Sequence, residues 1–239
     1  MTRIDEIAPD IFRISLYSTE AGMQFNHFLI RDEEPLLYHA GYKALFPEIR
    51  DAVCQLIEPS QLRWVGFSHF ESDECGALNE WLAVAPQAQA VTGIVGAMVN
   101  VNDFALRPAR ILQDKELFST GKKRLRYLRT PHVPHGWDAG LFFEETEKTL
   151  FTSDLFHQNG DVEPITQNSL SDRCSELLKG MQQSPFSDYI PYSAKVDGIL
   201  RELADFEPRT LAVMHGSSFS GDGRKAIQEL AAVWKEVLS

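Results

Sequence analysis

The sequence predicts one domain that mixes strands and helices, of the α/β or α+β class. Short β-rich runs and amphipathic segments interleave along all 239 residues, a pattern typical of sheets covered by helices. The composition, 44% hydrophobic and 24% charged, is that of an ordinary globular protein with a sizeable core. Because no low-complexity stretch, linker or short repeat divides the chain, residues 1–239 are expected to form a single domain.

The first segments predict strands and then a helix. Residues 10–17, "DIFRISLY", and residues 26–41 are rich in β-forming side chains, and the polar "RDEE" inside the second run indicates a hairpin. Residues 45–57 carry apolar side chains at helical spacing, which predicts a helix. The apolar run at residues 62–68 predicts a short buried strand, and helical spacing resumes over residues 78–85.

The remaining chain continues this alternation and becomes more helical toward its end. Strands are expected within residues 89–100, 109–113, 122–136 and 209–216, with two more around a polar turn in residues 139–156. Helices are expected over residues 174–181, 196–206 and 222–239, where apolar side chains recur on one face.

Charge and cysteine content exclude several classes of partner. The net charge of −11 disfavours nucleic acid and anionic membrane surfaces, because both attract positively charged proteins. The three cysteines, Cys54, Cys75 and Cys174, form no CxxC pair, which indicates a reducing compartment. The N-terminal residues lack the apolar stretch of a signal peptide, and no run of about 18 apolar residues occurs. A soluble cytoplasmic protein is expected.

The stretch "FSHFESDECG" places four metal-ligand types of side chain at the end of the strand at residues 62–68. They are His69, Glu71, Asp73 and Glu74. The first three stand at alternate positions, so on an extended loop they would converge from one side. Mixed imidazole and carboxylate ligation suits iron, manganese or zinc, and a carboxylate that bridges would suit two metals about 3.5–4 Å apart.

Three further candidates also follow expected strands: His135, Asp154 and His215. Strand ends are a common place for functional residues, because a rigid sheet holds them while loops present them. Each has an ordinary alternative when taken alone. The H-x-E-x-D stretch fits a solvated acidic loop, Asp154 fits a turn cap, and His215 fits a buried, hydrogen-bonded histidine. The joint pattern favours a metal site.

This joint pattern resembles the metallo-β-lactamase superfamily, and within it the iron-binding domain of flavodiiron proteins. That family carries H-x-E-x-D-H, a distant histidine, an aspartate about 19 residues later, and a final histidine. Here "HFESDE" matches all but the last histidine, "HGWD" supplies His135, "TSDLF" supplies Asp154, and "MHG" supplies His215. The resemblance implies an αββα sandwich, in which two packed mixed sheets are flanked by helices, and a centre of two non-heme iron ions.

The resemblance also implies a role for each residue. His69, Glu71 and His135 would hold one iron, Asp73 and His215 with Glu74 the other, and Asp154 would bridge them. Asp138 matches the aspartate that follows the family's histidine and is expected to accept a hydrogen bond from a ligand histidine. His132, His157 and Trp137 are candidates for supporting positions beside the metals, with surface or turn positions as the alternative. His27 and His39 are weaker candidates.

Two departures from the superfamily's patterns matter. The hydrolytic zinc members carry a histidine where this chain has Glu71, as the iron proteins do. Glu74 replaces the final histidine of the iron proteins' motif, and it either ligates the metal or faces solvent. No flavodoxin domain is expected within residues 1–239, so no FMN is expected on this chain. The chain then resembles the stand-alone oxygen-binding diiron proteins.

Three functional classes remain open on this basis. The first is a diiron protein that binds O2 or NO, as a sensor or a slow reductase. It would depend on a separate flavodoxin, rubredoxin or signalling partner, and a homodimer is expected. The second is a metal-dependent hydrolase of the metallo-β-lactamase type, against which Glu71 argues. The third is a non-catalytic scaffold with a vestigial site. Metal content separates the first class from the second.

Overall fold

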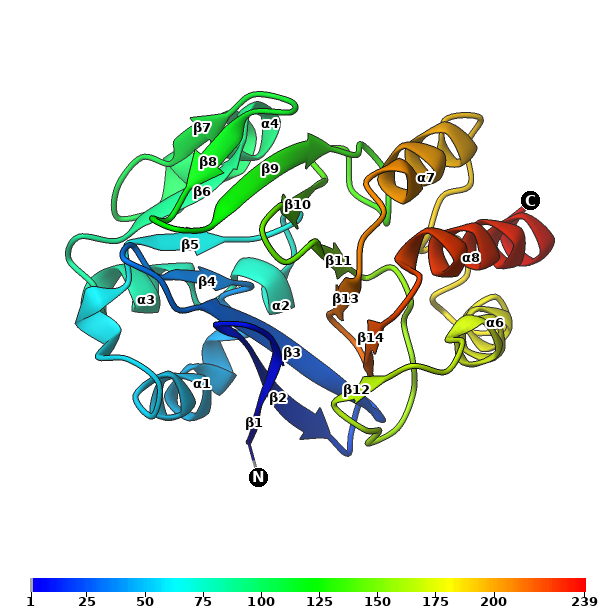
Figure 1. The fold of residues 1–239 in the computed structure, drawn as a ribbon, viewed down its shortest axis with the longest axis horizontal. Coiled ribbons are helices and arrows are strands. Elements are labelled where there is room, and N and C mark those ends of the chain that lie inside the picture. The colour runs from blue at the N-terminus through cyan, green and yellow to red at the C-terminus, as the bar shows by residue number, and fades with distance from the viewer. Residues whose placement is uncertain (1) are drawn as a thin grey trace.

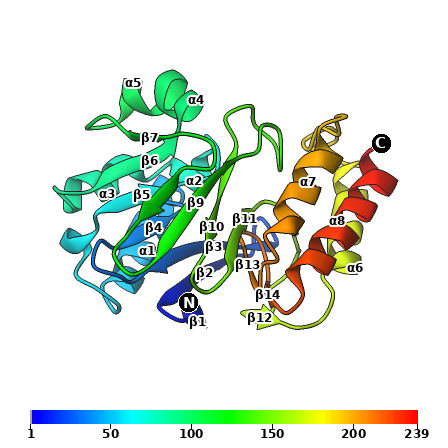
Figure 2. The same ribbon diagram turned by 45° about the horizontal axis from the view of Figure 1, so that its top comes forward.

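Two seven-stranded β-sheets pack face to face at the centre of the computed structural model, which describes residues 2–239 (Figures 1 and 2). The strand order is β1-β2-β3-β4-β5-β6-β7 in the first sheet and β12-β14-β13-β11-β10-β9-β8 in the second. The first sheet comes from the N-terminal half of the chain and the second from the C-terminal half. The two halves of the sequence therefore each contribute one layer of the centre.

The first sheet begins antiparallel and continues parallel. Strands β1 to β4 pair antiparallel, whereas β4 to β7 pair parallel. Its strands are β1 (Arg3–Ala8), β2 (Ile11–Ser18), β3 (Met23–Ile30), β4 (Leu36–Tyr38), β5 (Trp64–Gly66), β6 (Gln89–Gly93) and β7 (Arg110–Leu112). The parallel strands β4, β5 and β6 are short and fully or largely buried, as expected where helices cover a sheet, whereas the edge strand β7 is partly exposed.

The second sheet is also mixed. Strands β8 to β11 form an antiparallel meander, β13 pairs parallel with β11, and β14 pairs antiparallel with β13 and parallel with β12. Its strands are β8 (Leu117–Ser119), β9 (Arg124–Arg129), β10 (Gly140–Glu144), β11 (Thr149–Ser153), β12 (Ile165–Thr166), β13 (Thr210–Val213) and β14 (Ser218–Ser220).

Helices cover the outer face of each sheet (Figure 1). On the first sheet lie α1 (Phe46–Val53) and α3 (Leu78–Val84), and on the second lie α6 (Ser171–Met181), α7 (Val196–Asp205) and α8 (Gly223–Leu238). Shorter helical segments are α2 (Ser72–Cys75), α4 (Ile94–Gly96), α5 (Asn102–Phe104), η1 (Lys43–Leu45), η2 (Pro59–Gln61) and η3 (Ala97–Val101).

Three apolar clusters hold these four layers together. One packs α1 and α3 on the first sheet, with Trp81 fully buried, and one packs α6, α7 and α8 on the second, with Trp234 nearly so. The third lies between the sheets, where Phe28 and Tyr38 of the first face Phe142 and Phe151 of the second. The layer order is helix, sheet, sheet, helix, so the αββα sandwich expected from the sequence is confirmed.

Two expectations about individual segments are wrong. Residues 89–100 form the strand β6 only as far as Gly93, and the chain is helical beyond it, because only one face is buried there: Ala97 points inward while Met98 and Val99 are exposed. The motif segment is not a simple extended loop, since Asp73 and Glu74 lie on the helical turn α2. The strands β1, β8, β12 and β14 were not expected from the sequence pattern.

Among residues 2–239, no helix combines the length and apolar character needed to cross a bilayer.

Candidate metal centre

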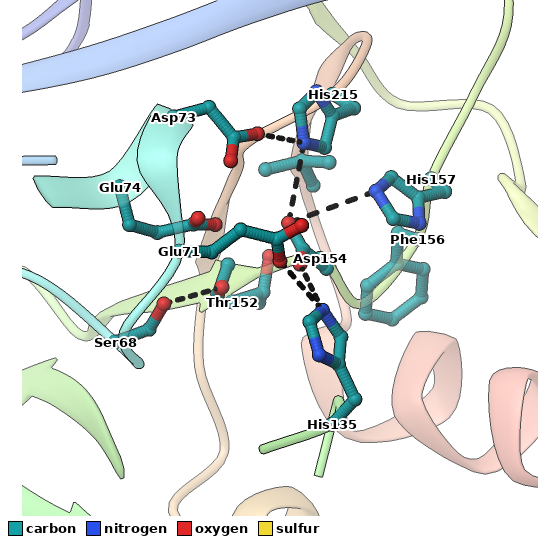
Figure 3. A network of polar contacts seen from close by, with 12 residues as sticks. Ser68, Glu71, Asp73, Glu74, His135, Thr152, Asp154, Phe156, His157 and His215 are labelled. Carbon is teal, nitrogen blue, oxygen red and sulfur yellow. Dashed lines mark hydrogen bonds and ion pairs between the residues drawn. The ribbon is translucent and has the colours of Figure 1, made fainter. Parts of the chain in front are cut away.

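Polar side chains from five separate segments converge in one place (Figure 3). His69 and Glu71 follow β5, Asp73 and Glu74 lie on α2, and His135 lies in the connection between β9 and β10. Asp154 follows β11 directly, and His215 lies two residues after the end of β13. The structure therefore brings together all seven residues that the sequence analysis assigned to metal binding.

Four of these residues form one group around an oxygen of Asp154. Its Oδ2 lies 2.9 Å from His135 Nε2 and 3.5 Å from His69 Nε2. Glu71 Oε2 lies 3.1 Å from His69 Nε2 and 3.3 Å from His135 Nε2. Their ligand-type atoms all lie within 4.8 Å of one another, which is the spacing that a single cation needs.

A second group forms around the other oxygen of Asp154 and around His215. Asp154 Oδ1 lies 3.2 Å from His215 Nε2, and Asp73 Oδ2 lies 3.4 Å from the same nitrogen. Asp73, Glu74 and His215 each place a ligand-type atom within 4.8 Å of the others. Asp154 therefore presents one carboxylate oxygen to each group.

His157 also reaches the centre. Its Nε2 lies 3.6 Å from Asp154 Oδ1, and its side chain is only 7% exposed. Asp154, His157 and His215 form a further group with ligand-type atoms within 4.8 Å of one another. The sequence predicted no more than a supporting position for this residue.

Several carboxylate oxygens of this centre are buried without a hydrogen-bond donor among the described residues. Both carboxylate oxygens of Glu74, Oδ1 of Asp73 and Oδ1 of Asp154 are buried and accept no hydrogen bond from the described residues. A buried carboxylate is costly unless a proton or cation compensates it. The donor set, four carboxylates and several imidazoles around two adjacent positions, fits divalent or trivalent metal ions such as iron.

Glu74 does not face solvent. Its side chain is 0% exposed, and Oε2 lies 3.9 Å from His69 Nε2. The alternative of a solvated loop acid is therefore wrong. The reason is that α2 turns the chain inward at Asp73 and Glu74, so that two consecutive acids both point into the centre.

Neighbouring groups orient the histidine rings. Ser68 Oγ lies 2.9 Å from His69 Nδ1 and 2.6 Å from Ser153 Oγ, so a pair of hydroxyls backs this ring. His215 Nδ1 donates to the backbone oxygen of Gln24 at 2.9 Å. In both rings the Nε2 atom is left to face the carboxylates, as is usual for histidines at metal sites.

Asp138 makes a different contact from the hydrogen bond to a histidine that was expected, and His132 occupies the turn position that was its alternative. Asp138 Oδ2 accepts from the backbone N–H of Phe70 at 3.1 Å and from Asn100 Nδ2 at 3.4 Å, and no hydrogen bond joins it to a histidine among the described residues. It holds the backbone between His69 and Glu71 instead. His132 is exposed at a turn, with a positive φ of 65°, and Trp137 is 56% exposed.

Tyr189 is a neighbour of the centre that the sequence analysis missed. Its Oη donates to Glu71 Oε2 at 3.1 Å, and its ring centroid lies 4.3 Å from that of His135. It belongs to the irregular segment between α6 and α7, where a single tyrosine carries no periodicity or spacing that points to a site.

Burial and charge shift the pKa values of these groups in opposite directions. Burial raises the pKa of Glu74 well above its usual range, and Asp154 and Asp73 add to the effect. Burial would lower the pKa of His215, but the carboxylates of Asp154 and Asp73 raise it to about 10. Burial would raise the pKa of Asp154, but His157, His135 and His215 hold it well below its usual range. Such opposed shifts at one place are typical of a functional site.

Comparisons with known proteins agree with this fold. The chain is 25% identical over 215 residues to flavo-diiron protein FprA2 of Clostridium acetobutylicum, covering 87% of this chain and 52% of that protein. It is 24% identical over 224 residues to the anaerobic nitric oxide reductase flavorubredoxin of Salmonella arizonae, covering 91% of this chain and 46% of that one. The chain thus spans about half the length of these curated relatives.

Solved structures show the same architecture. Rubredoxin oxygen:oxidoreductase from Desulfovibrio gigas superposes with a TM-score of 0.82 at 19% identity, over 96% of this chain and 61% of that one. A family model described as "ODP family beta lactamase" matches residues 23–216, more than half of the chain. The resemblance to the diiron domain of flavodiiron proteins is thereby confirmed, and this chain belongs to the ODP family of beta lactamases.

Proposed function

We propose that this chain is a non-heme diiron protein that binds O2 or NO and passes electrons to it from a separate donor. In this proposal His69, Glu71 and His135 hold the first iron, and Asp73, Glu74 and His215 hold the second. Asp154 bridges the two. When bound, two iron ions in their reduced state supply electrons to a diatomic ligand.

The observation that carries the proposal is the position of the Asp154 carboxylate. Oδ2 faces His135 and His69, while Oδ1 faces His215. The two oxygens of one carboxylate thus face two separate sets of nitrogen and oxygen donors. This is the arrangement expected of a residue that bridges two cations. A single metal ion would lie beside only one of these sets, and the negative charge of the carboxylates in the other set would have no cation next to it.

The donor types support iron. Four carboxylates, of Glu71, Asp73, Glu74 and Asp154, surround the two positions together with the histidines. Oxygen donors of this kind favour harder metal ions than thiolates do, and no cysteine sulfur belongs to any of the described groups. Zinc hydrolysis is less well supported, because Glu71 stands where a zinc-binding histidine is expected.

Other side chains and backbone atoms of the chain orient the ligand-type histidines and supply a proton donor beside them. Ser68 and the backbone oxygen of Gln24 hold the rings of His69 and His215 in place. The Tyr189 Oη lies 3.1 Å from Glu71 Oε2 and donates its proton to it, beside the partly exposed Glu71 of the first group. A proton donor at this place suits a reaction in which a reduced diatomic ligand takes up protons.

The printed names of relatives support the choice of ligand and donor. The Salmonella protein is named a nitric oxide reductase flavorubredoxin, and the Desulfovibrio structure a rubredoxin oxygen:oxidoreductase. For this chain we accordingly propose O2 or NO as the ligand and a carrier of the rubredoxin or flavodoxin type as the electron donor.

Elemental analysis followed by rapid mixing tests this proposal. Protein produced with iron and purified without oxygen is expected to hold about two iron ions per chain. Mixing the reduced protein with O2 or NO should change its optical spectrum on the timescale of the mixing experiment. A His135→Ala variant serves as the matched control, since it should lose first-site iron and the spectral change together.

Two results would contradict the proposal. One is stoichiometric zinc that iron cannot replace, which would favour a hydrolase. The other is a protein that holds about two iron ions per chain but whose optical spectrum does not change on mixing with O2 or NO.

A further inference from the structure

The loop after β11 fixes the ring of His157 beside Asp154. Phe156 has a positive φ of 65°, which turns the chain sharply between the two residues. The backbone N–H of Gln158 then donates to the backbone oxygen of His215 at 2.9 Å, and the Gln158 amide donates to Ser217. The segment that carries His157 is therefore tied to the turn that carries His215, and both rings are held against the same carboxylate.

The His157 ring points into the centre rather than away from it (Figure 3). Its Nε2 and that of His215 lie 3.6 Å and 3.2 Å from the same atom, Asp154 Oδ1. The two ring centroids are 4.5 Å apart and the rings are inclined by 33°. The side chain is 7% exposed, and its Nδ1 atom has no hydrogen-bond partner among the described residues.

A hydrogen bond to Asp154 does not account for this arrangement. The separation of 3.6 Å exceeds that of an ordinary N–H···O hydrogen bond. Moreover, Oδ1 is buried and accepts no hydrogen bond although two imidazole nitrogens approach it. Nitrogens and an oxygen that converge without bonding to one another leave room for a cation between them.

The position of Glu74 adds a second reason. Glu74 stands where the motif of the iron proteins has a histidine, so the second group would otherwise contain only one imidazole, that of His215. His157 and Glu74 lie on opposite sides of Asp154 in Figure 3. Glu74 shares a group with Asp73 and His215, whereas His157 shares one with Asp154 and His215. His157 thus approaches the second position from a different direction.

We infer that His157 is a ligand of the second metal through Nε2, so that this metal is held by two histidines, His157 and His215. The inference rests on the two-metal centre proposed above. It replaces the supporting position that the sequence suggested for His157 with direct coordination. It also means that His157, three residues after Asp154, supplies an imidazole in place of the one that the motif's histidine would supply at position 74.

Titration of metal-free protein with iron(II) under anaerobic conditions tests the inference. Wild type should take up about two ions, whereas His157→Ala and His157→Gln should each take up about one with wild-type affinity. His132→Ala is the matched control, because that histidine is exposed at a turn, and it should bind as wild type does. X-ray absorption of the loaded proteins should show fewer imidazole ligands per iron in the His157 variants.

The glutamine variant separates coordination from positioning. An amide side chain keeps a hydrogen-bond donor beside Asp154 but is a poor ligand for iron, so a merely positioning histidine would tolerate the change. Two ions bound by His157→Gln with wild-type affinity and an unchanged count of imidazole ligands would overturn the inference and leave the two-metal centre standing. Failure of wild type itself to bind two ions would instead remove the proposed centre. Near-ultraviolet circular dichroism shows that each variant is folded before titration.

Discussion

At the level of single residues, the centre contains carboxylates with buried oxygens that receive no hydrogen bond from the described residues. Glu74 is fully buried, and neither of its oxygens accepts a hydrogen bond from the described residues. One oxygen of Asp73 and one of Asp154 are also buried without a hydrogen bond from these residues. Leaving one buried polar group unpaired costs about 1–3 kcal/mol and more for a charged one, so several of them in one place fit a site that could hold a cation.

Asp154 should be the residue whose loss empties the centre. Asp154→Ala is expected to lose both metal ions, because each carboxylate oxygen faces a different group. Asp138→Ala should keep both but bind them about tenfold more weakly, since it supports the backbone of Phe70 rather than a metal. Metal content after desalting measures both variants. Equal metal loss in the two would show that Asp154 has no special position.

Among the helices and strands, strand ends and strained turns place the ligand-type residues. Ser153 and Phe156, with φ values of 50° and 65°, lie on either side of Asp154 in the left-handed region. Gly216 has a φ of 114°, and a Cβ at this position would lie 2.6 Å from Gln158 Cβ. Backbone of this kind persists only where surrounding structure holds it, and it is concentrated at functional sites.

Gly216→Ala should therefore lower stability and disturb the second group together. The added methyl group meets Gln158 in a conformation that alanine disfavours, so the free energy of unfolding should fall by about 1–3 kcal/mol. The displacement of His215 should also weaken binding of the second metal. Urea unfolding and iron(II) titration measure the two effects.

Gly180 offers a matched control within the same molecule. It lies in α6, and a Cβ there would meet nothing within 4 Å. Gly180→Ala should raise the free energy of unfolding by about 0.5–1 kcal/mol, because alanine loses less backbone entropy in a helix. If both glycine variants behaved alike, the turn at Gly216 would not be under steric constraint.

Over the molecule as a whole, the sandwich buries two histidines outside the metal groups. His27 on β3 and His39 after β4 are both fully buried. Nδ1 of His27 donates to the backbone oxygen of His39 at 3.1 Å, while His27 Nε2 and both ring nitrogens of His39 have no partner among the described residues. Burial lowers the pKa of His27 to about 4 and that of His39 to about 3.

These buried histidines should make the fold sensitive to acid. Folded His27 stays neutral down to about pH 4, whereas in the unfolded chain it takes up a proton near pH 6.5. The unfolded state then binds more protons between these values, so stability falls as pH falls from about 6.5 toward 4. Between pH 7 and pH 5 the loss attributable to His27 is about 2 kcal/mol.

A His27→Asn variant isolates this contribution. Asparagine keeps a donor near the backbone oxygen of His39 but does not titrate. Urea unfolding of metal-free protein at pH 7 and pH 5 should therefore show a smaller acid-induced loss in the variant than in wild type. Identical losses in the two proteins would mean that His27 does not contribute to acid sensitivity.

Periodicity predicted the long elements well, and short or irregular ones poorly. The helices α6, α7 and α8 lie where apolar side chains recur on one face, and the β10–β11 hairpin lies where two apolar runs flank a polar turn. Strands such as β8 and β12 have two or three residues and leave no measurable pattern. The segment after Gly93 is apolar in either conformation, so its helical state depends on what it packs against.

The spacing and types of residues along the chain were enough to predict the mixture of strands and helices. They were also enough to select the seven acids and histidines that lie together in the folded protein. Contacts in the folded molecule were needed to show that Glu74 points inward, that Asp138 supports Phe70, and that His157 and Tyr189 reach the centre. These outcomes depend on turns and on contacts between residues as much as 118 positions apart, and no local pattern records which distant group a side chain will meet.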